Sequence, residues 1–219
     1  MPERHSVPRA VTANVIASSV ASQAQIEIID FLPIDDGLED VCAPYAEAGL
    51  ARIYRRRQVA EALNAIGTTI EARVSSDDTA ARALVLILYG FHRARDFDTE
   101  AAGFDADVDV GEMLSRIVRD GPEVGVHTVV WSESATATTR RMSGAARREF
   151  SWRVVGAMSE DDSQSLIGTA GAVGLRDQQI IVANDDLGVM RRCTSLSCPP
   201  AEWAASLIAT VVRSELTER

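Results

Sequence analysis

The sequence contains no lysine, and all 22 basic residues among its 219 are arginine. This absence excludes a complete phosphate-binding loop within these residues, because such a loop needs a lysine on the β- and γ-phosphates of its nucleotide. Arginine is a poor replacement, since its planar fork does not act as a compact point charge. Aromatic residues are also scarce, at 5%. The core is therefore expected to consist mainly of alanine, valine, isoleucine and leucine.

Cysteine and histidine are too few and too scattered for a metal site. The three cysteines, Cys42, Cys193 and Cys198, are odd in number and have no Cys-x-x-Cys spacing. This pattern predicts free thiols in a reducing cytosol, with no metal and no cofactor expected. No signal peptide opens the sequence, and its longest apolar run, near residues 83–88, is far shorter than a membrane span. A cytoplasmic location without a membrane span is expected.

The charge balance is acidic, with a net charge of −10. It disfavours autonomous binding to nucleic acid, because affinity for phosphates depends mostly on counterions released at basic patches. The apolar content of 46% and charged content of 25% are those of an ordinary globular protein. Residues 1–9 contain two prolines and are expected to form a flexible arm. Residues 10–219 are expected to form a single domain.

Hydrophobic patterning predicts alternating strands and helices. Continuous apolar runs at residues 26–31, 83–90 and 126–131 predict buried strands of a parallel sheet. Shorter strands are predicted at residues 50–54 and 151–155. Residues 179–183 and 188–192 flank a polar turn and predict an antiparallel hairpin.

Helices are predicted by apolar residues at helical spacing and by capping residues. Asp35 or Asp36 is expected to cap one helix and Ser159 another, and the acidic residues 96–109 are expected to form a surface loop. The expected helices cover residues 10–22, 36–48, 56–74, 110–120, 135–149, 159–167 and 200–215. The alternation predicts an α/β fold: a parallel sheet with helices on both faces and the hairpin at its edge.

The order of these elements resembles that of FtsK/SpoIIIE-type ATPases, a RecA-like P-loop group that includes DNA translocases and EccC-type secretion ATPases. The resemblance extends from about residue 12 to residue 195, and the stretch 125–131 carries it best. Asp162-Ser163 and Gly171-Ala172 resemble the downstream serine and glycine-alanine signatures of the group. The segments that match are residues 26–31, 83–90, 121–134 and 149–155.

The sequence departs from this family at the positions that perform catalysis. The resemblance implies a first strand and a glycine-rich loop before the first helix, and residues 1–9 leave no room for them. It also implies an Asp-Glu pair where Tyr89 and Gly90 stand, and neither can hold magnesium through a carboxylate. The sensor pair is replaced by Ser132 and Glu133, and Glu133 would repel a γ-phosphate. We therefore expect a degenerate domain, similar to those of EccC-type ATPases, with no catalytic residue.

Several basic residues are candidates for contact with a phosphate or a partner. His92, Arg93 and Arg95 follow the central strand, where ligands of parallel sheets bind. Arg153 lies within a predicted strand, where a structural ion pair is the favoured interpretation. On the predicted helix over residues 135–149, helical spacing places four arginines in one basic stripe: Arg140, Arg141, Arg147 and Arg148. For all of them the alternative is an ordinary solvated or paired surface position.

Three functional hypotheses follow. The first is a non-hydrolysing module that acts structurally on, or regulates, an active ring ATPase in DNA translocation or type VII-like secretion. The second is one half of a split translocase, which would use ATP and magnesium only with a complementing partner. The third is a DNA-associated module. Without its first strand the sheet would keep an uncovered edge, so an oligomer or a poorly soluble monomer is expected.

Overall fold

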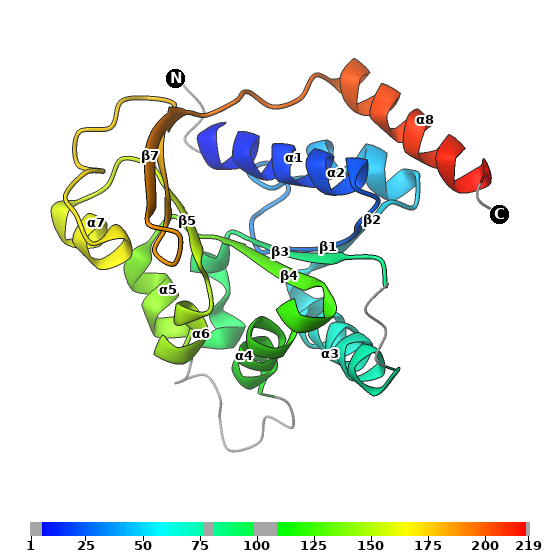
Figure 1. The fold of residues 1–219 in the computed structure, drawn as a ribbon, viewed down its shortest axis with the longest axis horizontal. Helices are drawn as coiled ribbons and strands as arrows, with labels where there is room; N and C mark the ends of the chain where they lie inside the picture. The colour runs from blue at the N-terminus through cyan, green and yellow to red at the C-terminus, as the bar shows by residue number, and fades with distance from the viewer. Residues whose placement is uncertain (1–5, 77–80, 99–108, 218–219) are drawn as a thin grey trace.

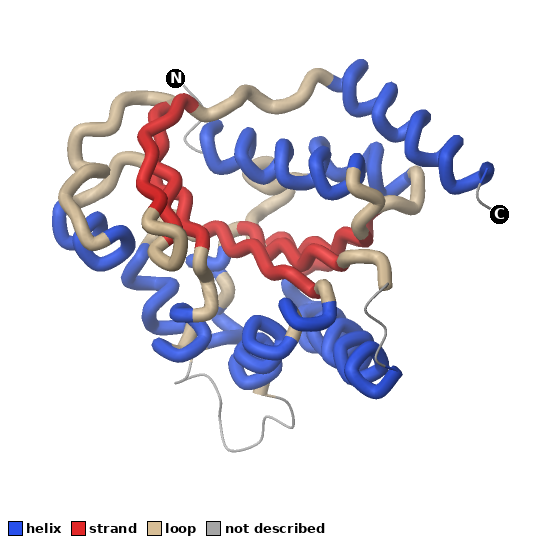
Figure 2. Tube along the Cα trace, in the orientation of Figure 1, coloured by secondary structure: helices blue, strands red, loops and turns tan. Residues whose placement is uncertain are grey.

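The computed structural model describes residues 6–76, 81–98 and 109–217. Its main layer is a parallel sheet of four strands in the order β2-β1-β3-β4. Helices α1, α2 and α8 cover one face of this sheet, and α3 and α4 cover the other (Figures 1 and 2). The strands are β1 (Gln25–Asp30), β2 (Ala51–Arg55), β3 (Leu84–Tyr89) and β4 (Val126–Trp131). The predicted α/β architecture is confirmed.

The helices begin and end near their predicted bounds, with the exceptions given below. They are α1 (Ser6–Ala21), α2 (Glu39–Glu47), α3 (Val59–Ser76), α4 (Val110–Asp120), α5 (Ala135–Arg141), α6 (Gly144–Arg148), α7 (Glu160–Ile167) and α8 (Ala201–Thr217). Ser159 caps α7 by accepting a hydrogen bond from the Asp162 amide at 3.2 Å, as predicted. Among the described helices, none is both long and apolar enough to cross a membrane.

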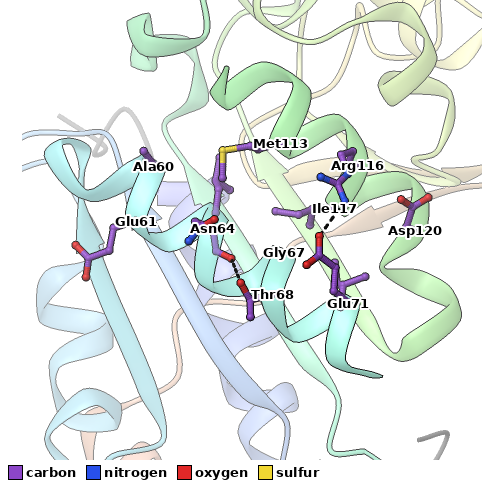
Figure 3. Close-up of a pocket in the computed structure, with 12 residues that line it drawn as sticks. Ala60, Glu61, Asn64, Gly67, Thr68, Glu71, Met113, Arg116, Ile117 and Asp120 are labelled. Carbon is purple, nitrogen blue, oxygen red and sulfur yellow. Dashed lines mark hydrogen bonds and ion pairs between the residues drawn. The ribbon is translucent and has the colours of Figure 1, made fainter. Parts of the chain in front are cut away.

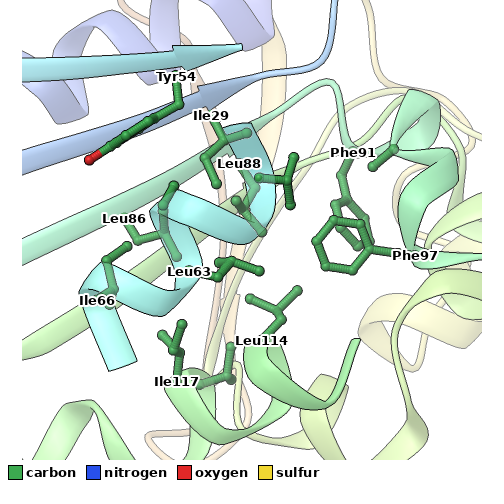
Figure 4. Close-up of a cluster of buried hydrophobic side chains, with 14 of the residues drawn as sticks. Ile29, Tyr54, Leu63, Ile66, Leu86, Leu88, Phe91, Phe97, Leu114 and Ile117 are labelled. Atoms are coloured by element: carbon green, nitrogen blue, oxygen red, sulfur yellow. The ribbon is translucent and has the colours of Figure 1, made fainter. Parts of the chain in front are cut away.

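Strand β3 lies at the centre of the core, because all six of its side chains are buried. Those on one side, including Leu86 and Leu88, pack with α3 and α4 in the cluster of Figure 4. Those on the other side, including Ile87, pack with α1, α2 and α8. A run buried on both faces is what the uninterrupted apolar stretch predicted.

A second sheet separates from the first, and here the structure differs from the expectation. Strands β5 (Trp152–Val155), β6 (Gln179–Asn184) and β7 (Val189–Thr194) form an antiparallel sheet of their own. The hairpin of β6 and β7 is present, but it does not lie at the edge of the parallel sheet. It pairs with β5 instead, so β4 is the last strand on its side of the parallel sheet.

Two local predictions need correction, and a third falls mostly outside the described residues. The arm expected over residues 1–9 is helical from Ser6 onward, and residues 1–5 lie outside the described part. Helix α2 is not capped by Asp35 or Asp36; its N-cap is Leu38. The loop expected over residues 96–109 falls mostly outside the described part, apart from a short 3-10 helix at Arg95–Phe97.

The helix predicted over residues 135–149 is two helices. Ser143 accepts a hydrogen bond from the Ala146 amide at 3.1 Å and so starts α6 afresh after α5 has ended. The predicted single stripe of four arginines is therefore wrong: Arg140 and Arg141 lie on α5, and Arg147 and Arg148 lie on α6.

The three cysteines are free thiols, in line with the expectation from their number and spacing. Burial, followed by the charge of Asp30, raises the pKa of Cys42 to about 12. Cys42 therefore stays protonated at neutral pH and serves as a small apolar side chain of the core.

Candidate functional site at the carboxyl ends of the central strands

The carboxyl ends of β1, β3 and β4 meet at one edge of the parallel sheet, where open α/β sheets bind ligands. The strand register places Asp30 beside Tyr89, and Tyr89 beside Trp131. The fold thus brings together the predicted positions Tyr89, Gly90, Ser132 and Glu133.

Tyr89 fills the position where the resemblance implies an acid. Its side chain is fully buried, and its ring stacks on Trp131 with ring centroids 4.5 Å apart. Burial, and then the charge of nearby Asp30, raise the pKa of the Tyr89 hydroxyl far above its usual range. The group is a neutral phenol at physiological pH, so it provides no negative charge for a magnesium ion.

Gly90 has no room for a side chain. Its φ of +77° lies in the left-handed region, which residues other than glycine rarely adopt. A Cβ atom there would approach Leu32 Cγ and Leu32 Cδ2 to 2.7 Å. A glutamate at this position, as the resemblance implies for an active enzyme, does not fit the present backbone.

His92 and Glu133 contact each other beside the stacked rings of Tyr89 and Trp131. The Glu133 amide donates a hydrogen bond to His92 Nδ1 at 3.1 Å, and the Glu133 carboxylate lies 3.6 Å from His92 Nε2. The imidazole meets the Trp131 ring edge-on, with centroids 5.4 Å apart. Ser132 donates to the Ser134 carbonyl at 3.0 Å, so this sensor-like hydroxyl is engaged in the local turn before α5.

The arginine candidates are scattered around the site. Arg93 and Arg95 are exposed on the segment after β3. Arg153 forms an ion pair with Asp185 across the second sheet, which agrees with the structural interpretation. Arg141 is 7% exposed, and it contacts the Asp98 carboxylate at 2.8 Å and the His92 carbonyl. Arg141 therefore anchors the segment that carries His92.

Replacing Arg141 with alanine is expected to lower the free energy of unfolding by about 2–4 kcal/mol, because it leaves the partly buried Asp98 without its main partner. Burial opposes ionisation of Asp98, but hydrogen bonding and charge from Arg141, with Arg140, lower its pKa overall. The stabilisation is therefore present above the unfolded pKa of about 4 and is lost as the pH falls through the lower folded value.

Arg140→Ala is the matched control, because Arg140 is mostly exposed although it also lies 3.3 Å from Asp98. Its substitution is expected to change stability by about 0.5 kcal/mol or less. Urea denaturation of both variants between about pH 2 and pH 8 measures the difference and its loss at low pH. Equal losses for the two variants would contradict the role assigned to Arg141.

Asp30 is a buried acid within the apolar run of residues 26–31 that predicts a strand. Its carboxylate accepts hydrogen bonds from the amides of Leu32 at 3.0 Å and Leu38 at 2.8 Å. Gly37 packs directly against this carboxylate and leaves no space for a Cβ atom. A signal was present in the sequence, because an aspartate ended an apolar strand a few residues before a proline and a glycine.

Ser163 and Ala172, which belong to the downstream signatures, are brought together. Ser163 is fully buried on α7; its hydroxyl donates to the Thr169 carbonyl and accepts from the Ala172 amide at 3.2 Å. The serine thereby fixes the loop of residues 168–174 against the second sheet, a structural role in this chain.

Replacing Ser163 with alanine is expected to lower the free energy of unfolding by about 1–3 kcal/mol, since a buried amide loses its acceptor. Ser165, exposed on the same helix, provides the control variant Ser165→Ala, which has no such bond to lose. Chemical denaturation measures both. A Ser163 variant as stable as the Ser165 variant would refute this role.

The hollows on the described surface include the following two. The larger, about 700 Å³, opens between the carboxyl end of β4 and strand β5, next to the stacked rings of Tyr89 and Trp131. The smaller, about 450 Å³, lies between α3 and α4 around Gly67, and a Glu71–Arg116 ion pair of 3.0 Å spans it (Figure 3). None of the residues lining the smaller hollow comes from the carboxyl ends of the strands. Within the described residues, no group of three metal-ligating side chains is close enough to hold an ion.

Comparison with known proteins finds no matching family model and no matching curated protein. Solved structures match well in three dimensions. The conjugation coupling protein TcpA of pCW3, in its monomer form with ATPγS, matches with a TM-score of 0.74 and 8% identity over 97% of this chain. ATPases 2 and 3 of EssC from Geobacillus thermodenitrificans match with a TM-score of 0.67 and 10% identity over 99% of the chain.

A third match is the cytoplasmic domain of the type VII secretion ATPase EccC from Thermomonospora curvata, with a TM-score of 0.64 and 14% identity over 96% of the chain. The chain spans 63%, 43% and 26% of the lengths of these three structures, in the order given. At such low identity the likeness shows the fold alone. The fold of this chain is that of the TcpA, EssC and EccC structures, which confirms the predicted resemblance at the level of the fold.

Proposed function

We propose that this chain is an ATPase-fold module that does not hydrolyse nucleotide itself and acts by binding an active ATPase of the same fold. The observation that carries the proposal is the chemistry at the end of β3. Where the resemblance implies two acids, a buried neutral phenol stacks on Trp131 and a glycine lies against Leu32. Phosphoryl transfer depends on magnesium and positioned charges, and this arrangement supplies neither acid.

The amino-acid composition supports the same proposal. The 219 residues contain no lysine, so a lysine on the nucleotide phosphates would have to come from outside them. Neither ATP nor magnesium is therefore expected to bind the chain alone. The fold, in contrast, is intact around β3, with side chains buried on both faces of the sheet. A stable fold without catalytic groups is what a structural or regulatory subunit requires.

The kind of partner follows from the fold. This chain resembles the structures of TcpA, a conjugation coupling protein, of two ATPase domains of EssC, and of EccC, a type VII secretion ATPase. We infer that the partner is an ATPase domain of this kind, which this chain stabilises or regulates inside the cell. A split translocase that is completed by another polypeptide is the alternative, and a DNA-binding role is disfavoured by the net charge of −10.

Two measurements on the purified chain test the proposal. Titration calorimetry with magnesium-ATP is expected to give no binding heat. Sedimentation with each FtsK/SpoIIIE-type ATPase encoded in the same genome is expected to reveal a complex with one of them, and that partner's turnover is expected to change on binding. ATP turnover by the chain alone, co-purifying with it and altered by a Trp131 substitution, would overturn the proposal. Turnover that appears only on mixing with an inactive partner would favour the split enzyme.

A further inference from the structure

The groove between β4 and β5 opens to solvent, and large apolar side chains line part of it among charged and polar ones. Val130 and Trp131 line it from β4, and Trp152 and Val154 line it from β5. The latter two side chains are 54% and 49% exposed, which is high for large apolar residues on neighbouring positions of one strand face. The groove has a volume of about 700 Å³ and adjoins the stacked rings of Tyr89 and Trp131. The proposed function does not use it.

Two strand edges border this groove. β4 is the last strand of the parallel sheet, and β5 is the last strand of the antiparallel sheet. Half of the backbone amides and carbonyls of an edge strand point away from its sheet and need a partner. An edge that also borders exposed apolar side chains is therefore matched by an extended polypeptide, which supplies both backbone hydrogen bonds and apolar side chains.

We propose that this groove receives an extended β-strand of the partner, which pairs with the carboxyl end of β4 at Val130 and Trp131 and buries Trp152 and Val154. The proposal deepens the proposed function and rests on it, because the strand would belong to the partner ATPase. A strand fits better than the sheet edge of a second copy. Val7 and Pro8 of α1 and Arg147 and Arg148 of α6 also line the groove, and a second copy would bring its own helices against them.

The chemistry of the strand follows from the lining. Side chains of both charge signs contribute, among them Glu133 and Asp162 together with Arg147 and Arg148, so a strongly acidic or basic segment gains little. The apolar side chains favour a neutral strand rich in β-branched residues, which fit a pleated and half-buried surface.

A labelled synthetic peptide tests the groove in the intact chain. The probe has about six alternating valine and threonine residues, the usual length of a strand, with a glutamate and a lysine at its ends for solubility. Fluorescence anisotropy measures its binding. Hydrogen exchange then locates it: slower exchange is expected in β4 and β5, and not at the hollow between α3 and α4.

Substitutions in the groove provide the control. Val154→Glu and Trp152→Glu change exposed side chains, so both variants are expected to fold, as checked by circular dichroism and thermal unfolding. Each is expected to weaken peptide binding by about tenfold or more. Leu187→Glu is the matched control, because Leu187 is 67% exposed in the hairpin turn and does not line the groove. It should leave binding unchanged.

The outcomes separate this inference from the proposed function. No peptide binding, equal binding by groove and control variants, or protection outside β4 and β5 would overturn the strand proposal. A partner ATPase that binds the Val154→Glu variant as well as the wild type would also overturn it, while leaving the proposed function intact. Peptide binding at β4, with no association to any ATPase, would support the groove and refute the proposed function.

Discussion

Replacing Gly90 with glutamate, the residue expected at this position in an active ATPase, is expected to destabilise the chain by about 2–5 kcal/mol without producing ATP turnover. The left-handed φ of +77° costs a residue with a side chain about 1–2 kcal/mol. The overlap with two carbon atoms of Leu32 at 2.7 Å adds about 1–3 kcal/mol. Urea denaturation followed by tryptophan fluorescence measures the loss, and a coupled assay measures turnover.

Two control variants separate the strain from the overlap. Gly188 also has a positive φ, +61°, but no atom lies within 4 Å of the place of its Cβ. Gly188→Ala is therefore expected to show the backbone cost alone, about 1 kcal/mol. Gly90→Ala should lower the free energy of unfolding by more than Gly188→Ala does. Part of that extra loss should be absent when Gly90→Ala is compared with wild type in a Leu32→Ala background. Equal losses for Gly90→Ala and Gly188→Ala would refute the packing argument.

This prediction bears directly on the proposed function. If the site had merely lost an acid, one substitution at Gly90 would restore it. The structure instead shows a backbone and a neighbouring side chain that have no space for that acid, next to a buried Tyr89 and its stack on Trp131. A Gly90→Glu variant that is as stable as the wild type and hydrolyses ATP would refute the proposal of a non-hydrolysing module.

The sequence predicted the elements whose signal is local. The uninterrupted apolar run at β3 predicted a central strand, and Ser159 predicted the start of α7. The sequence did not predict the features that depend on contacts between residues distant in the chain. The start of α2 depends on Asp30 at the end of β1, whose carboxylate accepts a hydrogen bond from the Leu38 amide. It does not depend on an aspartate beside the helix. The separation of β5 from the parallel sheet depends on its pairing with β6.

The candidate site was predicted in part. The family resemblance singles out Tyr89, Gly90, Ser132 and Glu133, and the fold does bring them to one edge. Trp131 was missed as a site residue, although it ends β4 at the same level as Tyr89 ends β3. Its importance arises from the parallel register, which only the paired strands define. The buried state of Arg141 was missed for the same reason, because Asp98 is distant in the sequence.

Asp30→Ala is expected to lower the free energy of unfolding by about 2–5 kcal/mol. The substitution removes the acceptor for two buried amides, those of Leu32 and Leu38, and each such loss costs about 1–3 kcal/mol. The substitution also removes the negative charge that pairs with Arg55, whose guanidinium lies 3.8 Å from the Asp30 carboxylate. The turn between β1 and α2 should loosen, with faster hydrogen exchange at the Leu38 amide. Asp40→Ala, at an exposed acid on α2, is the control.

The pH dependence of the Asp30 variant distinguishes this mechanism from a simple loss of packing. Burial raises the pKa of Asp30, and the amide hydrogen bonds and Arg55 only partly oppose it. A raised folded pKa stabilises the fold below the unfolded value of about 4, and that contribution is lost as the pH rises through the folded value. The stability difference between wild type and Asp30→Ala should therefore shrink as the pH rises above about 4 and then stay constant. A difference that grows with pH would mean that the ionised carboxylate is the favoured state, because the hydrogen bonds from Leu32 and Leu38 would then outweigh its burial.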